Sequence, residues 1–497
     1  MERTNSKNWP FILLYVCIGI FFLLGCILAI SALWVNRTFC VTFTELLYTL
    51  ANSLDGTGGN MFGVTMRNCL LPALPIALGY GAAVWFFGFY LPKKAQKPLL
   101  RRIVPAIMGA AALITCICAF LCADRLLKIT DYFEARNARS TVYEEHFVPV
   151  QDANPTAPTE KKNLLMIYLE SMETTYASRE AGGNQPVNYM PFMTELAQNN
   201  VSFSDKEGLG GFISVPGTTW TMGALFATSS GIPFSFPVGE NSMGKYDLFA
   251  SGVTALGDVL QRDGYYNQFL CGSDIAFAGR DKYYRDHGGY EIYDLHTARQ
   301  EGVIAEDYFV FWGYEDYILY DIAKKELTEL SQKDQPFNLT MLTVDPHHIG
   351  GYICPKCGND YENQTANVIS CADRLLEEFI SWCQQQPFYE DTVIVIIGDH
   401  PRMDNNLTAG LTYEQRPVYN CFMNTDIVPQ GATANRTFTP MDIFPTVLAA
   451  LNYSMEGDRI GLGTNMFSGA ETLAEELGLS DLQQEIQKYS VYYERFY

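Results

Sequence analysis

Basic residues are scarce over most of this chain of 497 residues. Of its 34 Lys and Arg, 11 lie in residues 1–128 with 4 of its 55 Asp and Glu, which leaves 23 basic against 51 acidic residues beyond that point. Such an acidic region has no basic face to neutralise phosphates, so we expect no nucleic-acid partner. The acidity is typical of a solvated surface and identifies no substrate.

Charge is absent from three long stretches, residues 10–35, 70–90 and 103–122. Each is about long enough to cross the ~30 Å hydrocarbon core of a bilayer as a helix. The first is too long for a signal-peptide core and lacks a convincing cleavage site, so we expect it to be retained. The sequence therefore predicts a multi-pass membrane protein with about three spanning helices.

The loop between the second and third stretches, residues 93–102, is basic and contains no acid. Loops of this kind stay in the cytoplasm. The N-terminus, with Arg3 and Lys7, is then also inside, and everything after residue 127 lies on the extracellular or periplasmic side. Residues 41–54 are apolar but too short to cross, so they form either an interfacial helix or a short outer helix packed on the bundle.

The chain divides by composition into three parts. Residues 1–128 form the transmembrane domain. Residues 129–162 are expected to continue the third span as a juxtamembrane helix and to end in a polar, Pro-rich linker. Residues 163–497 form the extracellular domain, and no internal repeat is found.

Apolar, strand-like runs alternate with helical patterns in the last part. The runs begin at residues 163, 337, 393 and 417, and an amphipathic helical pattern precedes the third. This alternation is typical of an α/β domain with a central, mostly parallel sheet covered by helices.

Two of these runs end in groups that bind metals. NLLMIYLE ends in Glu170, and VIVIIGDH ends in Asp399 and His400. Continuous β-branched runs are typical of strands buried on both faces, and ligands bind beyond the carboxyl ends of parallel strands. We therefore expect the three side chains to converge on a divalent cation, although a buried acid and imidazole can also be purely structural.

Thr218 follows a Pro-Gly turn at the expected start of a helix. Unpaired N–H groups and the helix dipole favour an anion at such a position. A threonine hydroxyl is a poor nucleophile unless a cation or a base lowers its pKa, which the expected metal would do. The alternative is an ordinary N-cap, with Thr221 completing the turn.

Cys354 and Cys357 form a Cys-x-x-Cys pair. The pair is either a local disulfide or two free thiols. A structural zinc site would need a second pair or histidines at ligand spacing, and Cys371 and Cys383 are too far apart in sequence to supply one.

Four motifs together resemble a known family: LESMETTY, PGTTWTMGALFATSSGIP, TVDPHHIGGY and IGDHPRMDN. The chain from about residue 163 to 467 is similar to the membrane-anchored phosphoglycerol transferases. These form a sulfatase-like branch of the alkaline phosphatase superfamily that includes lipoteichoic acid synthase. The motif forms are closest to the osmoregulated-glucan phosphoglycerol transferase.

The resemblance implies that one divalent ion is bound by Glu170, Thr218, Asp399 and His400. It also implies that Thr218 becomes phosphoglycerylated. An oxygen-rich ligand set with one imidazole suits manganese best, with magnesium or zinc as alternatives.

The resemblance also implies residues that contact the substrate. His347 would lie beside the transferred phosphoryl group, with His348 next to it, and Arg280 would pair with phosphate. The family often has an aromatic residue where this chain has Ala278, which leaves Phe277 as the aromatic candidate for the glycerol headgroup.

The implied reaction moves phosphoglycerol from phosphatidylglycerol to an extracellular glycan or glycerolphosphate acceptor and releases diacylglycerol. A phosphoethanolamine transferase acting on an envelope glycan or lipid is the alternative. A sulfatase is disfavoured because the segment from Ser214 to Thr218 lacks the arginine of the formylglycine motif. A non-catalytic anchored scaffold is disfavoured by the complete ligand set.

Overall fold

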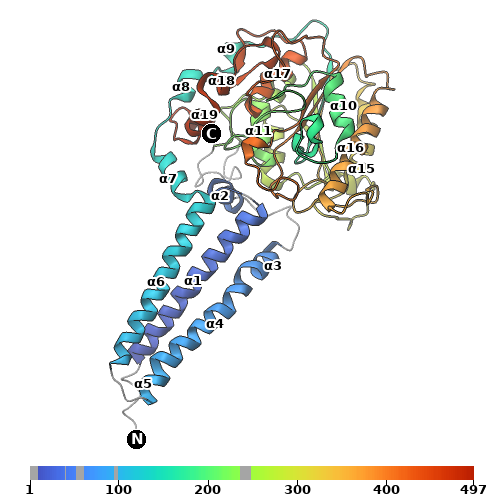
Figure 1. The fold of residues 1–497 in the computed structure, drawn as a ribbon. Helices are drawn as coiled ribbons and strands as arrows, with labels where there is room; N and C mark the ends of the chain where they lie inside the picture. Colours follow the sequence, from blue (N-terminus) through green and yellow to red (C-terminus); the bar gives the residue numbers. More distant parts are fainter. Residues whose placement is uncertain (1–8, 40, 52–60, 95–98, 236–247) are drawn as a thin grey trace. The chain divides into compact units, whose positions relative to one another are not determined.

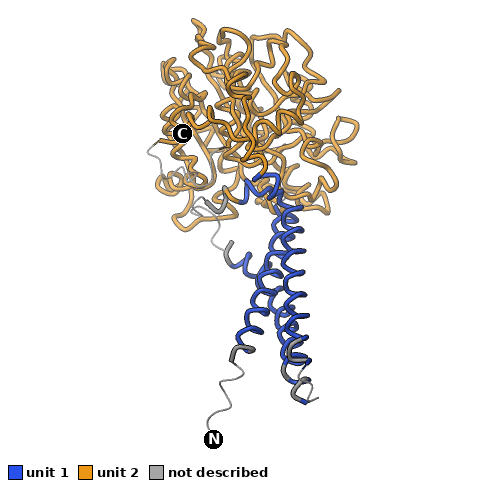
Figure 2. Tube along the Cα trace, turned by 90° about the vertical axis from the view of Figure 1, so that its left-hand side faces the viewer, with its two compact units in different colours: residues 1–46, 58–133 blue, residues 47–57, 134–497 orange. Residues whose placement is uncertain are grey.

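The computed structural model describes residues 9–39, 41–51, 61–94, 99–235 and 248–497 (Figure 1). The chain divides into two compact units (Figure 2). The first comprises residues 1–46 and 58–133, and the second comprises residues 47–57 and 134–497.

The first unit contains three helical segments that are long and apolar enough to cross a membrane, Ile12–Phe39, Gly63–Gly88 and Ile103–Leu127. They are formed by α1 (Trp9–Phe39), by a helix centred on α4 (Leu71–Trp85), and by α6 (Leu100–Leu127). Each leaves most of its apolar side chains exposed, as expected of helices whose solvent is lipid. The three predicted spans are therefore confirmed by length and composition, with ends shifted by several residues.

The expected continuation of the third span is interrupted. Lys128 has a left-handed backbone with φ 60° and ends α6, and α7 (Ile129–Asn137) begins at the next residue. Asp124 caps this break, because its carbonyl accepts from Lys128 N and its carboxylate accepts from Thr130 N. Of the predicted loop segments, α2 (Phe43–Ala51) is helical as expected, while residues 52–54 and 95–98 lie outside the described residues.

The second unit is built on a six-stranded sheet with the order β3-β2-β4-β1-β5-β6. The strands are β1 (Asn163–Leu169), β2 (Tyr266–Cys271), β3 (Glu291–Tyr293), β4 (Phe337–Leu342), β5 (Thr392–Gly398) and β6 (Asn420–Met423). All neighbours pair in parallel except β6, which is antiparallel to β5 at the edge. This confirms the predicted α/β fold.

Helices cover both faces of the sheet because its central strands are apolar on both sides. In β1, Leu164, Met166 and Tyr168 enter one core, and the residues between them enter the other. Helices of the first core are α11 (Thr221–Ser230), α12 (Leu256–Arg262), α13 (Arg280–Asp286) and α17 (Ile443–Ala450). Helices of the second are α10 (Pro191–Asn199), α15 (Asp316–Leu330) and α16 (Gln364–Cys383). Each fully buried apolar side chain contributes about 1.5–3 kcal/mol.

Much of the segment expected to form a juxtamembrane helix and linker, residues 129–162, packs into this unit. Val142 and Tyr143 of α8 (Val142–His146), with Val150 and Ala153 of α9 (Val150–Ala153), are buried in the first core. The backbone of Thr156 also pairs with Ser454. The globular unit therefore begins about thirty residues before the first strand.

Candidate metal and catalytic site

The site is built where β1 and β5 end side by side. Leu169 pairs with Gly398, so Glu170 and Asp399 leave adjacent strands at the same level. Gly398 allows this approach, because a Cβ there would lie 2.0 Å from the Met172 carbonyl oxygen. The ligand atoms of Glu170, Asp399 and His400 all lie within 4.8 Å of one another, and all three side chains are buried.

Hydrogen bonds orient each of the three groups. Asp399 Oδ1 accepts from the backbone N–H groups of Ser171 and His400, at 2.7 and 2.8 Å. The Ser171 hydroxyl donates to Glu170 Oε1 at 2.6 Å. His400 Nδ1 lies 2.9 Å from the Pro401 carbonyl, to which it donates, so Nε2 keeps its lone pair and faces the two carboxylates.

The pKa values of the two carboxylates shift in opposite directions. Burial raises the pKa of Asp399, and the charge of Glu170 raises it further. Burial also raises the pKa of Glu170, but His347, His400 and the Ser171 hydroxyl outweigh that effect and leave its pKa below the ordinary value. Two acids at one buried point are costly unless a cation joins them.

The cluster fits a divalent cation. Among the described residues, no donor hydrogen-bonds to Asp399 Oδ2, and His400 Nε2 lies 3.3 Å from this oxygen. A buried carboxylate oxygen that receives no hydrogen bond is typical of a metal ligand. Oxygen-rich coordination with one imidazole suits manganese, magnesium or zinc.

The hydroxyl beside the cluster belongs to Thr221. Its Oγ1 lies 3.3 Å from His400 Nε2 and 3.4 Å from Glu170 Oε2. Thr218, which the sequence predicted for this role, is fully buried, and its hydroxyl both donates to and accepts from the Val215 backbone at 2.9 Å. The expectation for Thr218 is therefore corrected, because its hydroxyl is already saturated within its own turn.

Thr221 is also the first residue of α11, three residues later than the predicted helix start. The first intrahelical bond is donated by Ala224 N to the Trp220 carbonyl. The preceding N–H groups of the helix have no intrahelical acceptor and lie at the positive end of its dipole. They can therefore receive the oxygens of a phosphoryl group beside Thr221.

His347 and His348 follow β4 in the loop beyond Thr343, whose hydroxyl accepts from Glu170 N. Their ring centroids are 4.3 Å apart, and His347 Nδ1 lies 2.8 Å from the His348 carbonyl. Burial lowers the pKa of His347, and the Glu170 charge offsets only part of this. Trp312 packs against His347 with ring centroids 4.7 Å apart.

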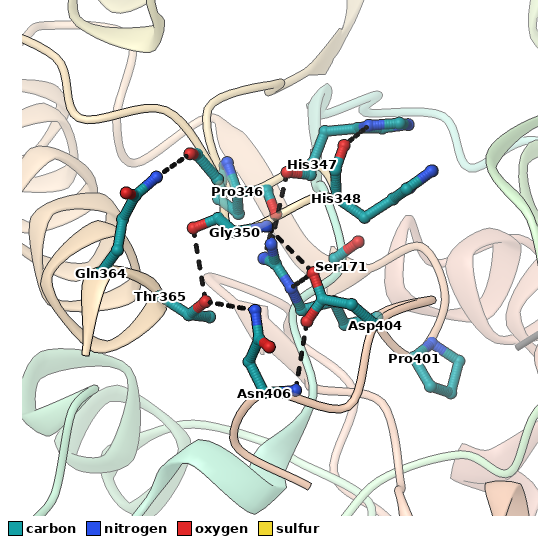
Figure 3. A network of polar contacts seen from close by, with 12 residues as sticks. Ser171, Pro346, His347, His348, Gly350, Gln364, Thr365, Pro401, Asp404 and Asn406 are labelled. Atoms are coloured by element: carbon teal, nitrogen blue, oxygen red, sulfur yellow. Dashed lines mark hydrogen bonds and ion pairs between the residues drawn. The ribbon is translucent and has the colours of Figure 1, made fainter. Parts of the chain in front are cut away.

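A buried arginine, Arg402, holds this loop in place. Figure 3 shows the loop residues Pro346, His347 and Gly350 together with Asp404. Arg402 donates from one terminal nitrogen to the Pro346 carbonyl and from the other to the His347 carbonyl, and from Nε to Asp404 Oδ2 at 2.8 Å. Asp404 in turn accepts from Gly350 N at 3.0 Å. The segment after β5 therefore contributes Asp399 and His400 to the cluster and, through Arg402, also positions the loop that carries His347 and His348 (the histidine loop).

The predicted Arg280 is buried and held by its own loop. It donates to the carbonyls of Phe277 and Asp274 and to the Ser273 hydroxyl. Its guanidinium lies 5.7 Å from the centre of the half-buried Phe277 ring, whose centroid is 5.5 Å from that of Trp312. A continuous row of side chains therefore links Arg280 to His347.

Sequence reasoning missed Thr221, Trp312 and Arg402 as site residues. Thr221 entered the sequence analysis only as the residue that completes the turn after Thr218. Arg402 stands two residues after His400, and a basic residue beside a buried strand end was a usable signal. Trp312 comes from a loop that carries no recognised motif.

Sequence comparison places the chain among known proteins. Residues 162–453 match the family model described as Sulfatase. The chain is 29% identical over 481 residues to phosphoglycerol transferase I of Salmonella choleraesuis, and equally to that of Salmonella typhimurium. The alignments cover 95% of this chain and 58% of each relative, so the chain spans little more than half the length of the curated relatives it matches.

Two solved structures are similar. Lipooligosaccharide phosphoethanolamine transferase A of Neisseria meningitidis matches over 91% of each chain, with a TM-score of 0.50 and 14% identity. Lipoteichoic acid synthase LtaP of Listeria monocytogenes matches 63% of this chain and 79% of its own, with a TM-score of 0.49 and 19% identity. The first of these likenesses bears on the fold alone.

Proposed function

Because the chain belongs to the sulfatase family, we propose that it is a metal-dependent phosphotransferase that uses a threonine nucleophile. Its donor is phosphatidylglycerol, and its acceptor is a hydroxyl of an envelope glycan or of polyglycerolphosphate. The similarity to phosphoglycerol transferase I supports the choice of headgroup.

The observation that carries the proposal is the position of Thr221. Its hydroxyl lies 3.3 Å from His400 Nε2 and 3.4 Å from Glu170 Oε2, at the first residue of a helix. A nucleophile, the groups that activate it and a set of anion-binding N–H groups therefore meet at one point. A purely structural cluster would need neither the hydroxyl nor the helix end.

Glu170, Asp399 and His400 would hold the divalent ion, for which manganese is the best candidate. When bound, such an ion supplies Lewis-acid chemistry that polarises phosphoryl oxygens and favours ionised hydroxyls. Glu170 Oε2 is the carboxylate oxygen toward which the Thr221 hydroxyl donates.

The transfer takes place in two displacements. In the first, the ionised Thr221 Oγ1, whose proton has passed by way of Glu170 Oε2 to solvent, bonds to phosphorus, and the bond from phosphorus to the diacylglycerol oxygen breaks. In the second, an acceptor hydroxyl bonds to phosphorus, and Thr221 leaves with its oxygen ionised again. The N-terminus of α11 and Arg280 bind the phosphoryl oxygens during both steps.

His347 moves the proton at its Nε2. Its Nδ1 faces the His348 carbonyl, so Nε2 is the nitrogen that gains and loses the proton. It protonates the departing diacylglycerol oxygen in the first step and accepts the proton of the acceptor hydroxyl in the second. Phe277 and Trp312 form an apolar wall beside this position for the glycerol headgroup.

The proposal also includes the side of the membrane on which the second unit lies. We assign the second unit to the extracellular or periplasmic side, because the basic loop near residues 93–102 marks the cytoplasmic one. Membrane-spanning helices would keep the enzyme at the bilayer that contains its lipid donor. We likewise assign residues 1–128 to the membrane and residues 163–497 to catalysis.

The test is to trap the covalent intermediate in the full-length protein in detergent. With headgroup-labelled phosphatidylglycerol and no acceptor, mass spectrometry should find a glycerophosphate adduct on Thr221. Thr221→Ala should lose transfer by several orders of magnitude, whereas Thr219→Ala, a change at a half-buried neighbour, should keep it.

Three outcomes would change the proposal. An adduct on Thr218 or Thr219 would reassign the nucleophile. A phosphoethanolamine adduct formed from mixed lipids would replace the donor by phosphatidylethanolamine, the alternative implied by the sequence. Turnover without any adduct under single-turnover conditions would contradict the two-step scheme.

A further inference from the structure

Three cysteine thiols meet in the second unit at a place that the proposed reaction does not use. Cys354 and Cys357 lie in the segment that follows His347, and Cys371 lies two turns into α16. Cys354 Sγ is 3.6 Å from Cys357 Sγ and 3.8 Å from Cys371 Sγ, and all three sulfurs lie within 4.8 Å of one another. In sequence, Cys371 is too far from Cys383 to form a second ligand pair for zinc. The fold instead brings Cys371 to the Cys-x-x-Cys pair.

The spacing of these sulfurs discriminates between two chemistries. A disulfide requires sulfurs about 2.05 Å apart and can join only two of the three. Tetrahedral zinc with Zn–S bonds of about 2.3 Å places its ligand sulfurs about 3.8 Å apart. The two Sγ–Sγ distances in the structure, 3.6 and 3.8 Å, agree with the sulfur–sulfur distance of a tetrahedral zinc site and together involve all three cysteines.

The surroundings support a site for a cation. Cys354 and Cys371 are each only 2% exposed, whereas Cys357 is half-buried and gives an entry path.

We propose that Cys354, Cys357 and Cys371 bind a thiophilic divalent cation of the zinc class, at a site separate from the cluster of Glu170, Asp399 and His400. As three sulfur–metal bonds form, the thiols that are still protonated release their protons to solvent. The fourth position is taken by water or another small ligand, as in zinc sites with three protein ligands.

The site would fasten a catalytic loop to a helix. Gln364 and Thr365, at the start of α16, already link the helix to the loop, because their side chains donate to the Gly351 and Gly350 carbonyls, respectively. Figure 3 shows the bond from Thr365 to Gly350. A metal at the three thiols adds a second link, three to seven residues further along the loop and six to seven residues further along the helix. Its loss should therefore loosen the loop that carries His347 without removing any group from the reaction centre.

The experiment compares metal content in the purified full-length protein. Wild type loaded with zinc and washed should retain zinc that survives in Asp399→Ala, because that variant removes only the other cluster. Cys371→Ser should lose this zinc, and Cys383→Ser, a change at a buried thiol in the same helix, should keep it. Cobalt in the Asp399→Ala background should give sulfur-to-cobalt charge-transfer absorption that Cys371→Ser abolishes.

Wild-type protein supplies a readout that does not depend on how well the variants fold. Alkylation under denaturing, metal-free conditions without reductant should label all three cysteines. A non-reducing peptide map in which Cys354 is joined to Cys357 or Cys371 in most molecules would overturn the proposal, as would Asp399→Ala protein that binds no zinc or cobalt. Neither result would bear on Thr221, so this site and the proposed transferase reaction fail independently.

Discussion

Replacing Arg402 by Met should loosen the histidine loop more than it damages the rest of the fold. Arg402 is 1% exposed and joins the segment after β5 to the loop at Pro346 and His347. Methionine keeps much of the volume and removes the guanidinium. Asp404 then keeps only its bonds from backbone N–H groups, among them that of Gly350.

The expected magnitude follows from the bonds that are lost. A hydrogen bond to a charged group contributes about 1.5–3 kcal/mol, and each bond to a carbonyl about 1 kcal/mol. Breaking one partner of a buried ion pair costs about 3–5 kcal/mol. Since domains are stable by about 5–15 kcal/mol, the variant should remain folded at low temperature. A local loss of about 3 kcal/mol corresponds to roughly hundredfold faster exchange of the loop amides.

Hydrogen–deuterium exchange measured by mass spectrometry on peptides covering residues 346–352 tests this expectation. Arg416→Met is the control, because Arg416 is a similarly buried arginine that pairs with Glu173 and bonds to the backbone carbonyl of Arg402 rather than to the loop. Arg402→Met should accelerate exchange of the loop peptides far more than Arg416→Met does. Equal exchange of these peptides in wild type and Arg402→Met would refute the idea that this arginine holds the loop.

Three further predictions concern metal, pH and topology. Asp399→Ala should remove the metal bound at its cluster and lower turnover at least about a hundredfold while the circular dichroism spectrum is kept; full activity after strong chelation would contradict this. Burial raises the pKa of Asp316 to about 7 and that of the adjacent Asp345 higher still. Above about pH 4 the folded state therefore holds more protons than the unfolded state. The apparent Tm should fall as the pH rises through neutrality. Asp345→Asn should flatten that dependence, and an unchanged profile would exclude this pair as its source. A C-terminal reporter that works only outside the cytoplasm should be active, and activity of a cytoplasmic reporter instead would reverse the topology.

The fold and the acidic ligands of the site could be predicted because both depend on local patterns. Continuous apolar runs identify strands buried on both faces, and an acid directly after such a run lies at the edge where ligands bind. Glu170 and Asp399 both satisfy this rule. The sequence could not show that their strands are neighbours, because β1 and β5 are more than two hundred residues apart.

The sequence was insufficient where the residue at which a helix begins, or a tertiary contact, decides which side chains meet. Thr218 and Thr221 both follow the Pro-Gly turn, and only the observed start of α11 shows which hydroxyl reaches the cluster. Cys371 seemed unpaired in sequence because its partners lie on a loop that α16 meets only in the folded unit. Trp312 reaches His347 through loop geometry that no periodicity encodes.

The central place of β1 has a consequence for how the protein is made. Its two neighbours in the sheet, β4 and β5, begin at residues 337 and 392, so β1 emerges from the ribosome long before either. Contacts of such long sequence separation form slowly. Until β4 and β5 have been made, both edges of the apolar strand β1 are unpaired, and such a strand is prone to associate with other chains. Folding should therefore benefit from a chaperone, and the proposed metal cluster can form only after residue 400 has been made and has reached Glu170.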